Sequence, residues 1–247
     1  MLLAGFLFSV AGRAQNIDYS QAMTELALIK NNFVTTDTTS FVSCQVGYYY
    51  SMESAPTTYL DSLFGQYKMT AGTHLYMKLG NTETIQGDTS MAVLYNNDST
   101  MMVGRPSPAN PISPTEESLF MIDSGFVAFN VSSITLTTQA GSKTMVFNFT
   151  DSSRYYNCKL VYDSATYIPK SLSYILRSTK MAEAGQPVPD GALVTIFISG
   201  FSRSPFDTSL LNMNRYFSIG ADGTVTLKPA YNNYNLVLTA NFLESYN

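Results

Sequence analysis

The sequence predicts a mainly β protein formed by one domain, and three observations support this prediction. Short runs in which apolar and polar residues alternate recur along most of the chain, which is typical of strands. Charged residues make up only 13%, while Tyr, Thr, Ser and Asn provide most of the polarity, as suits strands and turns. All-β folds often exceed 200 residues undivided, so we expect the 247 residues to contain one such domain.

The first fourteen residues have the pattern of a signal peptide. An apolar run from Leu2 to Val10 precedes Gly12 and Ala14, the small residues that a signal peptidase prefers before its cleavage point. We therefore predict that residues 1–14 are removed, that the domain covers 15–247, and that the protein is periplasmic or secreted. A buried N-terminal strand or helix is the alternative.

One amphipathic helix is predicted immediately after this segment, in "NIDYSQAMTELALIKNNF". Asp18 can accept a hydrogen bond at the helix start, and Gln21, three residues later, completes a capping box. Ala22, Leu26 and Phe33 recur at helical spacing on one stripe. A single helix of this length can cover part of a sheet but not all of it.

The apolar period changes to two from residue 41 onward, which predicts a meander of about five strands. In "HLYMKLGNTETIQGDTSMAVLYNNDSTMMVG", residues 74–104, we predict three short antiparallel strands. Apolar positions in phase along this region predict one shared face that is suited to an apolar ligand. Its members are Val42, Val46, Leu75, Met77, Met91, Val93, Met101 and Val103. Methionine adapts well to irregular ligands.

A proline-rich segment interrupts the strands between residues 105 and 126. Pro106, Pro108 and Pro111 exclude a regular strand, and a short helix that carries Leu119, Phe120 and Ile122 is predicted to follow. This helix is a candidate lid over the apolar face, and a simple corner connection is the alternative. Five further strands and a final hairpin around Asp222 are predicted beyond it.

The two cysteines, Cys44 and Cys158, both lie in predicted strands. Export would permit a disulfide between them. Two buried free thiols are equally compatible with the sequence, because cysteine packs well as a small apolar side chain.

The residues with catalytic potential do not form a recognisable set. His74 is the only histidine and alternates with the apolar positions, so we expect it at a polar rim. Glu116 and Glu117 suit a helix start, and Asp88, Asp98 and Asp222 suit turns. We predict that the protein is not an enzyme and has no cofactor or metal site, and a secreted hydrolase with two carboxylates is the rival class.

The net charge of −4 without a basic cluster excludes a nucleic-acid surface.

The order of elements resembles the LolA-like lipoprotein-carrier family, with its LppX and LprG relatives. The similarity is carried by the capped helix, by "GQYKMTAGTHLYMKLGNTETIQGD" and by the hairpin "AVLYNNDSTMMVG". The resemblance implies a curved antiparallel half-barrel whose concave face is apolar and whose helices form a lid. It also implies a periplasmic carrier of lipid or lipoprotein acyl chains that exchanges them with membrane-associated donor and acceptor proteins.

A closed β-sandwich, serving as a structural or adhesive module without a ligand, is the alternative. In that fold the same apolar residues would only pack against a second sheet.

Overall fold

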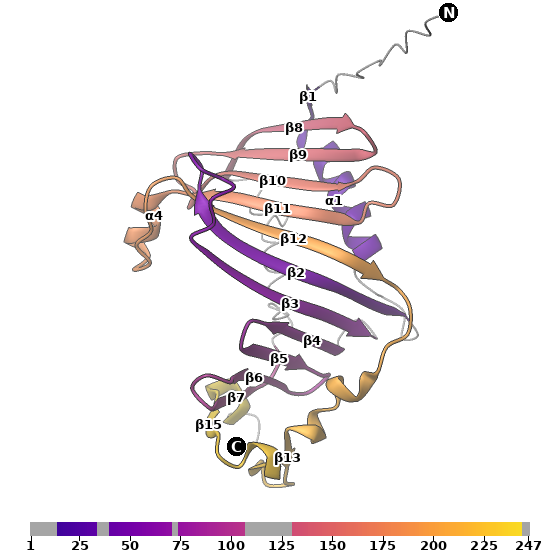
Figure 1. Ribbon diagram of the computed structural model, residues 1–247, viewed down its shortest axis with the longest axis vertical. Helices are drawn as coiled ribbons and strands as arrows, with labels where there is room; N and C mark the ends of the chain where they lie inside the picture. The colour runs from indigo at the N-terminus through magenta and orange to yellow at the C-terminus, as the bar shows by residue number, and fades with distance from the viewer. Residues whose placement is uncertain (1–13, 34–39, 71–73, 107–129, 244–247) are drawn as a thin grey trace, which may run out of the picture.

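The computed structural model of the chain describes residues 14–33, 40–70, 74–106 and 130–243 (Figure 1). The strands are β1 (Ala14–Asn16), β2 (Phe41–Met52), β3 (Asp61–Thr70), β4 (His74–Leu79), β5 (Thr82–Gln86), β6 (Met91–Tyr95), β7 (Thr100–Gly104), β8 (Val131–Gln139), β9 (Ser142–Phe149), β10 (Tyr155–Asp163), β11 (Pro169–Leu176), β12 (Ala192–Ser202), β13 (Phe217–Ile219), β14 (Val225–Leu227) and β15 (Asn235–Leu238). The α-helices are α1 (Tyr19–Phe33), α4 (Ser178–Glu183) and α5 (Ala240–Leu243), and the short 3₁₀-helices are η1 (Thr208–Leu211), η2 (Met213–Arg215) and η3 (Pro229–Tyr231).

One open, twisted sheet of thirteen strands dominates the fold, in the order β1-β8-β9-β10-β11-β12-β2-β3-β4-β5-β6-β7-β15 (Figure 1). Neighbouring strands are antiparallel except β15, which runs parallel to β7. Strand β12 joins the two meanders, because it pairs with β11 on one side and with β2 on the other. The mainly β prediction is confirmed. The alternative of two large sheets packed as a sandwich is wrong for the described residues, because β13 and β14 form the only other sheet there.

Helix α1 lies across one face of the sheet, behind the strands in Figure 1. Its predicted capping box is present: the Gln21 backbone N–H donates to Asp18 Oδ1 at 2.8 Å, and the Asp18 N–H donates to Gln21 Oε1 at 3.2 Å. Ala22, Ile29 and Phe33 are buried against the strands, so the amphipathic stripe packs as its spacing predicts.

The sheet has a core on each face. The helix face is the one under α1, and its core extends from Ile134 on β8 to Met77 on β4. The tail face is the opposite one, where residues of β4 to β7 pack against the C-terminal segment through Leu211, Phe217 and Phe242. Strand β4 is therefore buried on both faces, with Met77 on the helix face and Tyr76 on the tail face.

A polar contact fixes α1 on the helix face. Glu25 accepts a hydrogen bond from Lys143 Nζ at 2.6 Å and another from the Tyr162 hydroxyl at 2.7 Å. Tyr162 is fully buried, and burial together with the Glu25 carboxylate raises the pKa of its hydroxyl. Tyr162 therefore stays neutral and keeps donating over the ordinary pH range.

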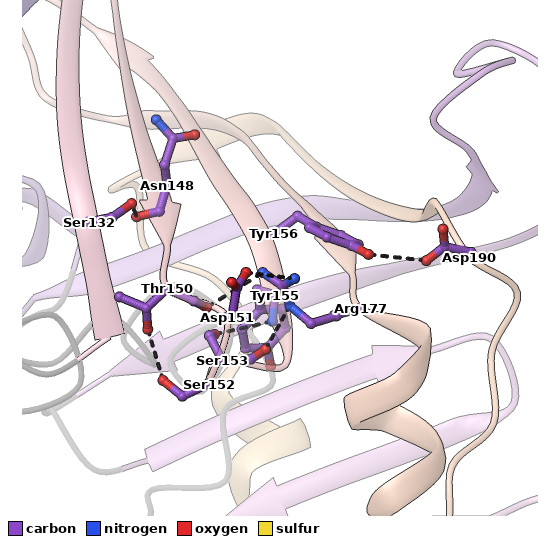
Figure 2. Close-up of polar contacts among 10 residues, drawn as sticks. All are labelled: Ser132, Asn148, Thr150, Asp151, Ser152, Ser153, Tyr155, Tyr156, Arg177 and Asp190. Carbon is purple, nitrogen blue, oxygen red and sulfur yellow. Dashed lines mark hydrogen bonds and ion pairs between the residues drawn. The ribbon is translucent and has the colours of Figure 1, made fainter.

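Arg177, the residue after β11, binds the connection between β9 and β10 at one end of the sheet (Figure 2). Its Nε donates to the Ser153 carbonyl at 3.2 Å, its guanidinium lies 4.1 Å from the Tyr156 ring centre, and Nη1 lies 3.2 Å from Asp151 Oδ1. The Arg177 side chain is only 13% exposed, whereas that of Asp151 is fully exposed. Helix α4, which the sequence patterns did not predict, begins directly after this arginine.

We expect Arg177→Lys to lower the free energy of unfolding by about 1 to 3 kcal/mol, because an ammonium cannot reproduce the planar fork that bonds the carbonyl and stacks on Tyr156. Asp151→Asn should cost less than about 1 kcal/mol, since an exposed ion pair contributes little. Urea unfolding of the two variants measures the difference. Equal stabilities would show that the Asp151 pair, rather than the buried contacts, accounts for the role of Arg177.

Candidate functional site

Four of the predicted ligand-binding residues lie together in the helix-face core. Val42, Val46, Leu75 and Met77 are each at most 5% exposed and belong to the cluster that contains Phe33 of α1. Their alternation placed them correctly on one face. They pack against the helix and one another, so this part of the face is a closed core.

Met91 and Val93 also lie on the helix face and are buried, while Met101 and Val103 do not lie there. Leu94 pairs with Met101 and Val93 with Met102, so the β6–β7 hairpin turns Met101 toward the tail face. The prediction of one face for all eight residues is therefore wrong for Met101 and Val103, which belong to the tail-face core. A change of one residue in register moves every side chain to the other face.

The other predicted features have different outcomes. Leu119, Phe120 and Ile122 lie outside the described residues, as do Glu116, Glu117 and residues 1–13 of the predicted signal peptide 1–14. Cys44 and Cys158 are buried free thiols on β2 and β10, with β11 and β12 between them, so the disulfide alternative is wrong. Three strand spacings amount to about 14 Å, well beyond the reach of a disulfide.

An open groove lies on the helix face beside the closed core. It has a volume of about 270 Å³ and is lined by Tyr48, Tyr49, Tyr50, Asp61, Ser62, Leu63, Tyr174 and Val194. Among these, the opposed pair Tyr49 and Ser62 occupies the alternate positions whose side chains point to the tail face. Pairing explains how the strands assemble it: Tyr50 on β2 is opposite Val194 on β12, and Val194 is opposite Tyr174 on β11. Tyr48 pairs with Leu63 on β3 in the next part of the groove. No α1 residue is part of the described lining.

The groove is apolar and aromatic, with one carboxylate at its margin. Tyr48, Tyr174 and Val194 are partly buried against the helix-face core. Burial and the neighbouring Tyr48 and Tyr155 raise the pKa of the Tyr174 hydroxyl, so it stays neutral at ordinary pH. Asp61 is exposed and supplies the only formal charge in the described lining. Such a groove offers stacking and apolar contact but no evident catalytic pair.

A second cleft, of about 470 Å³, lies between the β5–β6 turn and the η1–η2 segment, and His74 is part of its lining. His74 Nε2 lies 3.6 Å from Asp88 Oδ2, with the two side chains 34% and 65% exposed. This confirms a polar rim for His74. Asp98 and Asp222 lie in turns, as predicted. Within the described ranges, no three His, Cys, Asp or Glu residues gather as a potential metal site.

Alternation from residue 41 onward predicts a shared face but does not identify the groove, whose lining includes Tyr48, Tyr50 and Leu63. Tyr174 and Val194 were not predicted, although both occupy inward positions of strands that were. Which part of the face stays open depends on where α1 lies, and the period of the strands carries no information about that.

No protein-family profile and no curated protein matches this sequence. Among solved structures, an uncharacterized conserved protein from Thermus thermophilus is 10% identical with a TM-score of 0.46, covering 89% of this chain and 99% of that one. A LolA superfamily protein from Nitrosomonas europaea is 9% identical with a TM-score of 0.34, covering 78% and 98%. MucB from Pseudomonas aeruginosa, solved in complex with MucA, is 12% identical with a TM-score of 0.37, covering 82% and 63%. The chain thus has a distant structural resemblance to LolA superfamily and MucB structures.

Of the described helices, none is long and apolar enough to cross a membrane.

Proposed function

We propose that this chain is an exported binding protein, and not an enzyme, that holds an acyl chain or another extended apolar ligand in the groove. The observation that carries the proposal is the open groove lined by Tyr48, Tyr50, Tyr174, Leu63 and Val194. Small-molecule sites usually have a volume of about 300 to 1,000 Å³, so 270 Å³ suits a section of a chain rather than a whole lipid.

The energy of such binding comes from apolar burial. Each methylene that leaves water contributes about 0.8 kcal/mol, so a groove that encloses about six would gain roughly 5 kcal/mol before the cost of association. Tyrosine side chains add rigid contact area with little loss of conformational entropy. Lipid or a lipoprotein acyl chain is the ligand we propose, with membrane-associated proteins as donor and acceptor.

Val194→Asp tests the groove, because it places a charge against any apolar ligand there. We expect at least a tenfold weaker uptake of a fluorescent fatty acid, since pairing a carboxylate with an acyl chain leaves the carboxylate unsatisfied. Thr195→Asp is the matched control: it is the next residue on β12, is also partly buried, and points to the tail face. Its uptake should equal that of the unchanged protein.

Native mass spectrometry of freshly purified protein, followed by lipid extraction, tests whether a ligand is carried. A protein that carries no lipid and binds no fluorescent acyl probe would refute the proposal. Equal uptake by the Val194→Asp and Thr195→Asp variants would place the binding elsewhere.

A further inference from the structure

Four large apolar side chains are exposed within six residues at the end of the β2–β3 hairpin. Tyr59 is 47% exposed, Leu60 60%, Leu63 44% and Phe64 61%, and together we name them the apolar tip. Single exposed apolar residues are common on soluble proteins, but a contiguous group of them marks an interaction surface.

The tip continues into an aromatic cluster on the tail face. The Tyr49 ring centre lies 4.3 Å from that of Tyr59, 5.5 Å from Phe64 and 5.4 Å from Phe197. Phe197 is itself 43% exposed. Gly47 pairs with both Phe64 and Phe197, and its lack of a side chain leaves room for the Tyr49 ring over the strand.

The tip is apolar on both faces of the sheet. Leu63 points to the helix face, where it lines the groove, and Phe64 points to the tail face beside Tyr49. Strand β4 pairs with β3 only from Gly65 to Thr70, so Asp61–Leu63 projects past it without a described strand on that side. A protein partner would cover one face of such a projection, whereas the interfacial layer of a bilayer surrounds both.

The charges and hydrogen bonds of the segment also favour lipid over a partner strand. Residues 49–64 contain two acids, Glu53 and Asp61, and no Lys or Arg. The segment therefore has no basic side chain that would attract anionic lipid. Asp61 Oδ1 accepts the Ser62 backbone N–H at 2.7 Å, which occupies a donor that an added strand would need. Tyr, Phe and Leu are side chains that partition into the membrane interface.

We propose that the apolar tip inserts into the interfacial region of an electrically neutral lipid bilayer. Leu63 belongs both to the tip and to the groove, so a docked protein would place the groove mouth at the membrane surface. If the proposed function holds, an acyl chain could then pass between bilayer and groove with little exposure to water.

The chain contains no tryptophan, so a single introduced tryptophan reports its own surroundings. Phe64→Trp should show blue-shifted emission with phosphatidylcholine vesicles and quenching by brominated lipid, at both low and high salt. Val237→Trp on the edge strand β15, 41% exposed in the unchanged protein, is the control and should show neither change.

Polar substitution at the tip should release the protein from vesicles. Leu60→Ser and Phe64→Ser each remove one apolar side chain from the inserted tip. We expect each variant to partition about tenfold more weakly onto vesicles. Both variants should still take up the fluorescent fatty acid from solution, whereas Val194→Asp should lose uptake and keep vesicle binding. This separates failure of the membrane contact from failure of the proposed function.

Three results would overturn the proposal. They are an absence of partitioning onto neutral vesicles, partitioning that requires anionic lipid and vanishes at high salt, and a blue shift that depends on protein concentration without vesicles. The last would assign the tip to a second copy of the chain.

Discussion

Gly65→Ala is expected to lower the free energy of unfolding by at least about 3 kcal/mol, because the new methyl group meets backbone rather than a movable side chain. A Cβ atom on Gly65 would lie 1.8 Å from the Lys78 carbonyl oxygen and 2.9 Å from Leu79 Cα. Gly65 is opposite Leu79 at the end of the β3–β4 ladder, so the two strands must separate to admit it. Glycine within a strand often marks such a close backbone approach.

The separation would affect the core as well as the ladder. Tyr67 and Met77 are opposite each other two residues along these strands, and both belong to the helix-face core. Chemical denaturation measures the loss. Gly87→Ala is the control, because its Cβ would have no neighbour closer than 3.7 Å and should change stability by less than about 0.5 kcal/mol. Equal stability of the two variants would contradict the β3–β4 register.

The sequence predicts most of the strands and the one long helix, because alternation and capping are local properties. It predicted three strands in residues 74–104, where the structure has four, β4 to β7. The missing strand, β5 in "TETIQ", turns Thr84 and Gln86 to the helix face and has Ile85, buried on the tail face, as its one apolar residue, so its apolar pattern is weak. The sequence patterns also do not predict the parallel pairing of β15 with β7, because it joins segments more than 130 residues apart.

The face of each strand is harder to predict than the strand itself. Tyr95 pairs with Thr100 across the "NNDS" connection, so odd-numbered residues of β6 share a face with even-numbered residues of β7. A connection one residue longer or shorter would have put Met101 on the same face as Val93. Hairpin geometry therefore decides which residues enter the core, and the apolar pattern of β7 fits both faces: Met101 and Val103 on one, Met102 on the other.

The open groove depends on features that alternation does not encode. Val46 and Tyr48 are adjacent inward positions of β2, yet Val46 lies in the closed core and Tyr48 lines the groove. The difference arises from the part of the sheet that α1 covers. Glu25 and Tyr162 fix that helix through a contact between residues 137 positions apart, which no local pattern reveals.

The protein is expected to lose stability steeply as the pH rises above about 9, because its two thiols are buried. Burial raises the pKa of Cys44 and of Cys158 from 9.0 to about 12. In the unfolded chain these thiols ionise near pH 9, while the folded protein keeps both protons. The unfolded state then binds fewer protons, so the free energy of unfolding falls as the pH rises from about 9 toward 12.

Each thiol should reduce stability by about 1 kcal/mol per pH unit in that window, so the pair would cost roughly 4 kcal/mol between pH 9 and 11. This is a large share of the roughly 5 to 15 kcal/mol that stabilises a typical domain. Buried tyrosines act in the same direction from about pH 10, since burial also raises the pKa of Tyr162 and Tyr174.

A double variant with Cys44→Ala and Cys158→Ala separates the thiols from the tyrosines. It should be less stable than the unchanged protein at pH 8, where small cavities are the only difference, but its stability should fall less between pH 9 and 10. Denaturation curves under a reducing agent across pH 8 to 11 measure both slopes. Because the unchanged protein loses stability faster, its advantage over the variant should shrink as the pH rises. Parallel slopes would contradict the prediction, because they would mean that the two thiols, only 2% and 5% exposed, ionise as readily in the folded protein as in the unfolded chain.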